Sequence, residues 1–222
     1  MNILAIDPSS RNLGWAIVSE VAVLNAGLIQ STQEDKGFRF VEMMESFLPI
    51  FEEAMKENVK LVVIEEYVTK SRYGTDAVKG IIGVIQYIIA RQGFKATFIH
   101  PSTVKLLVTG HGKAEKEQVA ESVYVQYPFS ARTYTDNNIT DAIAIGIAGF
   151  RKIEKEQIVI DKVKEFAEAN DGKLSATTIY RSKIVKDRKQ AGMILAILRS
   201  KYEIEDFKNK TIFKLPWIEI DQ

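Results

Sequence analysis

The chain has 222 residues, enough for one large domain or for a domain of ordinary size with a small appendage. Apolar residues make up 46% of it and charged residues 27%, which is typical of a soluble globular chain and excludes wholesale disorder and collagen-like sequence. No apolar run approaches the roughly 20 residues that a transmembrane helix needs. The first residues also lack the features of a signal peptide, so we expect no association with a membrane.

The residue types also restrict metal chemistry. The chain has no cysteine and only two histidines, which excludes disulfides, zinc–cysteine sites and a histidine-rich metal site. Any bound metal must therefore have mainly oxygen ligands. The lack of cysteine weakly favours the cytoplasm, either of the cell that encodes the protein or of a host cell if the gene is viral.

Charge is distributed unevenly along the chain, although the formal net charge is only +1. Residues 1–150 hold 14 Lys or Arg and 17 Asp or Glu, whereas residues 151–222 hold 16 and 12. Basic residues are densest between Arg181 and Lys189. Such a cluster can contact phosphate groups, but a solvated helix face explains it equally well.

Hydrophobic periodicity predicts alternating strands and helices over the first two thirds of the chain. Short apolar runs predict strands at 2–7, 15–18, 21–29, 60–64 and 96–99. Apolar residues at steps of three and four predict helices at 36–58, 77–90, 119–125 and 140–151, with a further helical turn from Pro101. The first three strands should form an antiparallel meander. We therefore expect an α/β fold, a mixed sheet flanked by helices.

The remaining residues predict a second, smaller unit. Helical patterns cover 153–170, 176–181 and 189–202, and two strand-like pieces flank residues 208–210. Three helices and a hairpin in about seventy residues suggest a small basic module with a winged-helix-like arrangement. The sequence thus predicts one domain over residues 1–152 and a C-terminal module over residues 153–222.

Acidic residues follow two of the predicted core strands. Asp7 and Glu65 each come at the end of a strand, and Asp141 lies near the start of an apolar helix. Clustered carboxylates beside apolar neighbours are costly unless something compensates them, and a divalent cation is the usual compensation. Taken singly, each acid is more readily explained as a solvated turn residue or a helix cap. Their spacing alone does not decide between the two.

Four ordered segments carry a resemblance to a known family. They are residues 3–15 (ILAIDPSSRNLGW), residues 62–66 (VVIEE), residues 101–119 with the patterns PxxVK and GxGxAxKxxV, and residues 138–144 (NITDAIA). This order and spacing resembles the RuvC-type Holliday-junction resolvases, members of the RNase H-like nuclease superfamily. The resemblance covers residues 3 to about 150 and implies an RNase H-like fold for that part of the chain.

The resemblance implies hydrolysis of a DNA phosphodiester with Mg²⁺, which Mn²⁺ can replace. Asp7 would bridge two ions, while Glu65 would hold one of them and Asp141 the other. Lys105 and Lys116 match the two basic active-site positions of the family. A lysine there offers a compact charge to the scissile phosphate or the leaving oxygen.

Two positions depart from the family pattern. Asn138 stands where the family has an acid or a histidine; an amide oxygen can bind Mg²⁺ but adds no charge, so one metal site should be weaker. Val68 stands where the family has an aromatic residue that wedges into the junction. Tyr67 or Tyr73 could take over that stacking, although a simple role in packing the loop is equally open for both.

Further DNA contacts and a dimer are also implied. Ser10 could bind a phosphate or simply close its turn, and Lys113 lies within the GxGxAxK pattern. The basic cluster adds the candidates Arg181, Lys183, Lys186, Arg188 and Lys189. The predicted helix at 77–90 is apolar on more than one face and so must be covered twice, by a second copy of the chain or by the chain's own residues. The resemblance favours a homodimer.

The sequence therefore predicts a dimeric, metal-dependent, structure-selective endonuclease that resolves four-way DNA junctions by paired nicks in recombination and repair. One alternative is a nuclease of the same fold that acts on flaps or RNA–DNA hybrids. Another is a non-catalytic adaptor that binds branched DNA, for which Asn138 is the best argument. An actin-like ATPase or sugar kinase is disfavoured, because the sequence shows no pattern of the adenosine site that such proteins carry.

Overall fold

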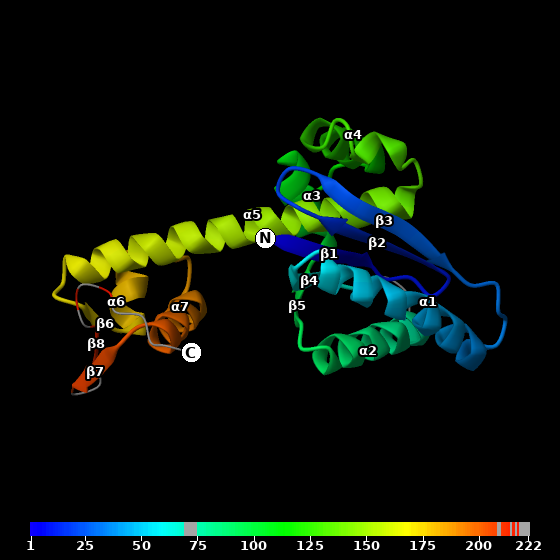
Figure 1. Cartoon of the computed structure of the whole chain (residues 1–222). Helices are drawn as coiled ribbons and strands as arrows, with labels where there is room; N and C mark the ends of the chain where they lie inside the picture. Colours follow the sequence, from blue (N-terminus) through cyan, green and yellow to red (C-terminus); the bar gives the residue numbers. More distant parts are fainter. Residues whose placement is uncertain (69–74, 208–209, 214, 216, 218–222) are drawn as a thin grey trace. The chain divides into compact units, whose positions relative to one another are not determined.

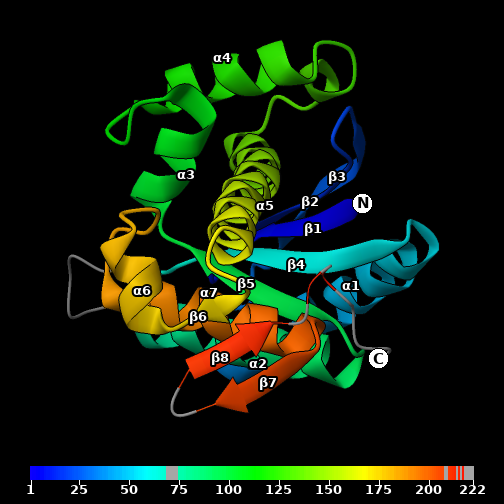
Figure 2. The same cartoon turned by 90° about the vertical axis from the view of Figure 1, so that its left-hand side faces the viewer.

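The computed structural model describes residues 1–68, 75–207, 210–213, 215 and 217 (Figures 1 and 2). The chain forms two compact units, Met1–Lys152 and Ile153–Gln222. None of the helices in the described part of the chain is long and apolar enough to cross a membrane.

The first unit is built on a mixed five-stranded sheet with the order β3-β2-β1-β4-β5. Its strands are β1 (Asn2–Asp7), β2 (Asn12–Val18), β3 (Val23–Gln30), β4 (Val59–Glu65) and β5 (Lys95–Ile99). Strands β1 to β3 pair antiparallel, as a meander, whereas β4 pairs parallel with both β1 and β5. The α/β class and the mixed sheet expected from the sequence are confirmed.

Helices follow the strands where the periodicity placed them. They are α1 (Lys36–Lys56), α2 (Thr75–Arg91), α3 (Pro101–Thr109), α4 (Lys116–Gln126), the short 3₁₀ helix η1 (Ala131–Thr133) and α5 (Asn137–Glu168). Local chemistry explains several ends. The Asp35 carboxylate accepts hydrogen bonds from the first backbone N–H groups of α1. Proline occupies the first turn of α3, and Gly110, with a φ of 81°, ends that helix.

The helices cover both faces of the sheet (Figure 1). On one face, aromatic and aliphatic side chains of α1 and α2 form a core with alternate residues of the strands. This core includes Phe47, Phe51, Ile81, Ile85, Leu4, Ile6, Val62 and Ile64. On the other face α5 lies very close to the strands, because a Cβ at Gly146 would come within 2.4 Å of the Val18 side chain. Only glycine permits that approach.

One continuous helix replaces the two that the sequence predicted at 140–151 and 153–170. Helix α5 runs without interruption from Asn137 to Glu168. The residues at the expected break, 151–156, are Arg, Lys, Ile, Glu, Lys and Glu, which include neither a glycine nor a proline. Most of them are strong helix formers, so the helix continues. It ends before Asp171 and Gly172, which both have positive φ angles.

The second unit consists of the last part of α5 and a small helical and stranded assembly. Its further elements are β6 (Lys173–Leu174), α6 (Ala176–Arg181), α7 (Arg188–Lys201), β7 (Ile204–Phe207) and β8 (Lys210–Phe213). The three strands form an antiparallel sheet in the order β6-β8-β7. The hairpin and the helices α6 and α7 lie where the sequence predicted them. Strand β6, with two residues, is too short to show a periodicity.

Candidate active site

Strand alternation directs Asp7 and Glu65 to the same side of the sheet. In the parallel pair of β1 and β4, Ile6 is opposite Ile64, so the next residues, Asp7 and Glu65, come level at the carboxyl ends of two neighbouring strands. Ile6 and Ile64 belong to the core under α1 and α2. Because successive side chains point to opposite faces, Asp7 and Glu65 point to the face that α5 covers.

Gly14 brings the start of α5 onto that same corner of the sheet. Gly14 is paired with Asp7 across the antiparallel β1–β2 ladder. A Cβ at Gly14 would lie 2.1 Å from the backbone oxygen of Asn138, in the first turn of α5. The helix therefore begins directly over β2 at the level of Asp7. Asp141, one turn after Asn138, is thereby placed at the same corner.

The pKa values show that the three carboxyl groups interact. The pKa of Asp7 is raised from 3.8 to about 7, mainly by burial and also by the charge of Asp141, while Lys116 opposes the rise. The pKa of Glu65 is raised from 4.5 to about 8, mainly by burial and also by the charges of Asp7 and Asp141. We refer to Asp7, Glu65 and Asp141 as the acidic centre. Its members lie close enough to repel one another and are partly shielded from water.

Lys116 supplies the positive charge that faces the acidic centre. Its Nζ donates a hydrogen bond of 3.0 Å to Oδ2 of Asp141, and this bond raises the pKa of the lysine. Lys116 is the first residue of α4, after Glu115, whose side chain takes part in a capping box with Gln118.

In this conformation, the residues that the structure describes include no set of three acidic or histidine side chains arranged to hold one ion.

Lys105 lies in α3 and is bonded to the loop that leads to Lys116. Its Nζ donates a hydrogen bond of 2.6 Å to the backbone oxygen of Ala114. Its charge also lowers the pKa of Glu65, although by less than burial and the acidic neighbours raise it. Lys105 thus contributes positive potential to the acidic centre while it holds the loop before α4 in place.

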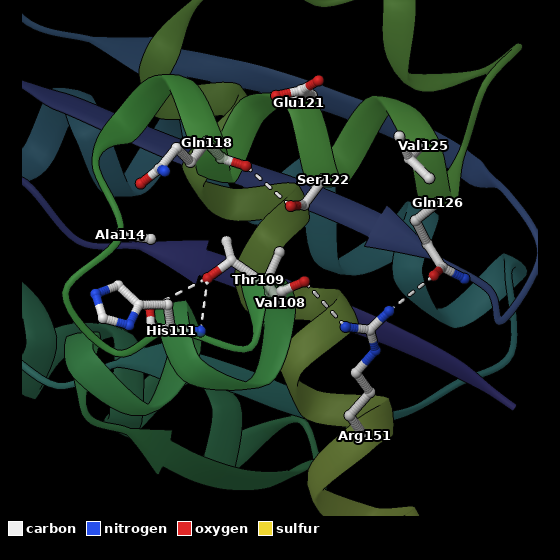
Figure 3. A pocket seen from close by; sticks show the side chains of 10 residues that line it. All are labelled: Val108, Thr109, His111, Ala114, Gln118, Glu121, Ser122, Val125, Gln126 and Arg151. Carbon is white, nitrogen blue, oxygen red and sulfur yellow. Dashed lines mark hydrogen bonds between the residues drawn. The ribbon is translucent and has the colours of Figure 1, made fainter.

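Arg151 of α5 ties α3 and α4 together, a role that the sequence gave no sign of. Its guanidinium donates to the backbone oxygen of Leu107 at 2.5 Å. It also donates to the backbone oxygen of Val108 at 3.1 Å and to Oε1 of Gln126 at 3.0 Å (Figure 3). These contacts satisfy carbonyl groups at the end of α3. Arg151, Val108 and Gln126 line a pocket of about 370 Å³, which His111 also lines. Because α3 carries Lys105 and α4 carries Lys116, Arg151 helps to fix both lysines.

Other predicted site residues lie around this corner. The Asn138 amide donates to Oδ1 of Asp136 at 3.1 Å, and the Asn138 backbone N–H donates to the same oxygen at 2.8 Å. Tyr67 and Val68 are exposed just after β4, whereas Tyr73 lies outside the described residues. Lys113 is exposed in the loop before α4.

The turn after β1 is closed by Ser9 and not by Ser10. The Ser9 hydroxyl accepts hydrogen bonds from the backbone N–H groups of Arg11 and Asn12, at 3.4 and 3.3 Å. The side chain of Ser10 is half-buried and makes no hydrogen bond within the described part of the chain. The alternative role suggested for Ser10, closing the turn, therefore belongs to its neighbour.

The basic cluster belongs entirely to the second unit. Its members Arg181, Lys183, Lys186, Arg188 and Lys189 are all exposed. The Arg188 guanidinium lies 5.7 Å from the centre of the Tyr180 ring, a cation–π contact between the end of α6 and the start of α7.

A mixed sheet of this order, with carboxylates at the ends of its two central strands and a third on the covering helix, defines the RNase H-like class of nucleases. The family model described as "Crossover junction endodeoxyribonuclease RuvC" matches residues 3–149. The RuvC protein of Ruegeria pomeroyi is 32% identical over 151 residues, which cover 66% of this chain and 89% of that protein. The RuvC protein of Rickettsia bellii is 30% identical over 150 residues, which cover 65% of this chain and 94% of that protein. The chain therefore belongs to the RuvC family of crossover junction endodeoxyribonucleases.

Solved structures show the same fold. Thermus thermophilus RuvC superposes with a TM-score of 0.60 at 21% identity, over 69% of this chain and 96% of that one. The T. thermophilus RuvC complex with a Holliday junction substrate superposes with a TM-score of 0.59 at 22% identity, over 67% of this chain and 92% of that one. The family model ends at residue 149, so residues 153–222 lie beyond it.

Proposed function

We infer that this protein is a structure-selective endodeoxyribonuclease that resolves Holliday junctions in DNA recombination. The observation that carries the inference is the acidic centre, which lies on the segments that match the family model. Proteins of this family are divalent-metal-dependent nucleases. The substrate of the T. thermophilus relative, a Holliday junction, is the substrate that we assign to this chain.

The chemistry of the oxygen donors in the acidic centre suits a hard divalent cation, Mg²⁺ or Mn²⁺. Carboxylate oxygens are the ligands that such ions prefer, and two of the three groups have pKa values raised by burial and by the nearby negative charge. A bound cation would remove that repulsion. We assign Asp7 to a position shared by two ions, with Glu65 and Asp141 each holding one, and Asn138 as a neutral ligand beside Asp141. The metal would supply an activated water and stabilise the departing oxygen.

We assign electrostatic roles in the reaction to the two lysines. Lys116 already lies within hydrogen-bonding distance of Asp141 and is 62% exposed, so its ammonium group can turn from the carboxylate to the scissile phosphate. Lys105 is held by Ala114 and adds positive potential near Glu65. Charges fixed in this way stabilise negative charge that develops on a phosphate during cleavage.

Helix α2 is the proposed dimer interface. Val78, Ile81, Ile85 and Ile89 are buried against the sheet. On the outer side, Tyr87 and Leu48 are 61% and 44% exposed and line an apolar groove of about 420 Å³ with Val84 and Ile88. A second copy would cover this surface and place two acidic centres on the two strands of a junction. The substitution Tyr87→Glu should therefore give a monomer that makes unpaired nicks. Phe129→Glu, at an exposed aromatic residue of another segment, is the control.

The test of the function is cleavage of a synthetic four-way junction beside flap, RNA–DNA hybrid and linear duplex substrates. The inference predicts Mg²⁺-dependent, symmetrically paired nicks in the junction and slower cleavage of the others. Preference for flaps or hybrids would assign the same chemistry to another substrate. Junction binding without cleavage in Mg²⁺ or Mn²⁺ would make the protein an adaptor.

A further inference from the structure

The C-terminal unit lies beyond the segment that the family model matches, and its own structure assigns it a role. We propose that residues 153–222 form a winged-helix module that binds the phosphate backbone of duplex DNA through the end of α6, the following turn and the outward face of α7. This duplex contact is separate from the chemistry of the acidic centre and adds affinity for the arms of the substrate.

The order of elements is that of a helix–turn–helix followed by a wing. After the last part of α5 come β6, α6, α7 and the hairpin β7–β8, with β8 between the other two strands. Helices α6 and α7 share one core, which includes Ile179, Val185, Ala191 and Ile194. In helix–turn–helix proteins the second helix enters the major groove while the first crosses the backbone. Helix α7 occupies the position of the second helix.

The turn between α6 and α7 has a defined conformation. The Ser182 hydroxyl donates to the backbone oxygen of Ile179 at 2.6 Å, and Lys183 has a φ of 61°. The Asp187 carboxylate caps α7 by accepting a hydrogen bond of 2.7 Å from the backbone N–H of Gln190. A turn fixed in this way presents its basic side chains at little cost in conformational entropy on binding.

Charge complementarity points to a polyanion as the partner. Residues 181–189 contain five basic residues, all exposed, and one acid, Asp187, which caps α7. Helix α7 itself contains four basic residues and no acid. A surface of this composition matches the closely spaced phosphates of duplex DNA and releases their counterions on binding.

The outward face of α7 carries side chains that are slim enough for the helix to enter the major groove of DNA. Ala191, Ile194 and Leu198 are buried, and the opposite face carries Lys189, Met193, Ala196 and Ser200, all exposed. These four residues recur at steps of four, three and four, and all of them have short or unbranched side chains. Met193 is the one large apolar residue on this face, too little for a protein interface, which usually has a cluster of aromatic or aliphatic anchors.

The experiment compares two double substitutions in the full-length protein. Lys186→Gln with Lys189→Gln removes two charges from the proposed surface. Lys155→Gln with Lys162→Gln removes two exposed charges from α5 as the matched control. Affinity for a linear duplex is measured by fluorescence anisotropy in EDTA at several salt concentrations, so that no cleavage occurs.

The proposal predicts that the first variant loses about two from the slope of log affinity against log salt, and roughly tenfold or more in affinity, whereas the control does not. Junction cleavage by the Lys186→Gln, Lys189→Gln variant at saturating protein should keep the wild-type rate. A failure of the proposed nuclease function would therefore be seen separately from a failure of this proposal. Equal affinity and slope in the two variants would overturn the proposal and leave a protein partner as the occupant of this surface.

Discussion

Lys116 and Asp141 form an ion pair of 3.0 Å at the edge of the acidic centre, with the lysine on α4 and the aspartate on α5. The lysine thus provides a cation beside carboxyl groups whose pKa values are raised by burial and mutual repulsion. In the proposed mechanism, the same flexible ammonium group turns from the acids of the free protein to the phosphate of the complex. α4 is held in place at its far end by Tyr127, whose hydroxyl donates to the Ser19 backbone oxygen at 2.7 Å.

Lys116→Gln tests this dual role. The variant removes the charge but keeps a polar side chain that is one atom shorter, and single-turnover junction cleavage in saturating Mg²⁺ should fall about 10²- to 10³-fold. Lys113→Gln, three residues earlier and exposed, should change the affinity for DNA and leave that rate nearly unchanged. A Lys116→Gln variant that cleaves at the wild-type rate would show that the lysine only balances Asp141.

The stability of the metal-free protein should fall as the pH rises from about 4 to about 8. The pKa values of Asp7 and Glu65 are raised in the folded protein to about 7 and about 8, from 3.8 and 4.5. The folded state therefore holds more protons than the unfolded state across this window, so deprotonation favours unfolding. Below about pH 4 this loss of stability is absent, and above about pH 8 it is complete.

Urea unfolding in EDTA between pH 5 and pH 9 measures this dependence. Asp7→Asn should flatten the profile and raise the free energy of unfolding at pH 8, because the amide carries no charge. Mg²⁺ should stabilise the wild-type protein more at pH 8 than at pH 6, where protons compete for the carboxylates. A free energy of unfolding that rises steadily with pH in EDTA would contradict the proposed repulsion within the acidic centre.

Gly14→Ala should damage the fold and the site together. The new Cβ would have to move the backbone oxygen of Asn138, which lies 2.1 Å from its ideal position. Crowding of this kind costs about 1–3 kcal/mol, and displacement of α5 moves Asp141 relative to Asp7. Thermal unfolding and cleavage rates should show a lower melting temperature and a loss of about 10²-fold in rate. Wild-type values for both would mean that α5 does not lie this close to β2.

Asn138→Asp should lower the Mg²⁺ concentration needed for half-maximal cleavage. It adds a negative charge one helical turn before Asp141, and it replaces the Nδ2 group that donates to Asp136 with an oxygen. Titration of Mg²⁺ in a junction cleavage assay measures the change, which we expect to be several-fold. Asn137→Asp adds the same charge at the neighbouring exposed residue and should leave the titration curve in place. If both variants lower the Mg²⁺ concentration for half-maximal cleavage equally, residue 138 does not bind the ion and the added charge acts only at a distance.

Much of the first unit could be predicted because its strands and helices are strongly periodic. Asp7 and Glu65 were identified as residues at the ends of two core strands, and the parallel register of β1 and β4 places them side by side. Their approach to Asp141 was predictable only through the family resemblance. The physical cause is the contact between Gly14 and the first turn of α5, which joins residues more than a hundred positions apart.

The rest depended on interactions that local patterns do not reveal. Arg151 is the last residue of the helix predicted at 140–151, and no local pattern shows that its guanidinium binds the backbone of α3 and the side chain of Gln126. The break expected near residue 152 was wrong, because an apolar-to-charged change in composition does not end a helix that contains no breaker. Of the two roles left open for Ser10, closing the turn belongs to its neighbour Ser9.

The most direct test of the account is the Asp7→Asn variant, assayed for both junction cleavage and junction binding. If Asp7 holds the catalytic ions, cleavage in saturating Mg²⁺ should fall by at least about 10³-fold, while the affinity for the junction in EDTA stays within a few-fold of the wild type. Cleavage at an undiminished rate, or loss of binding together with cleavage, would contradict the metal-binding role of the acidic centre.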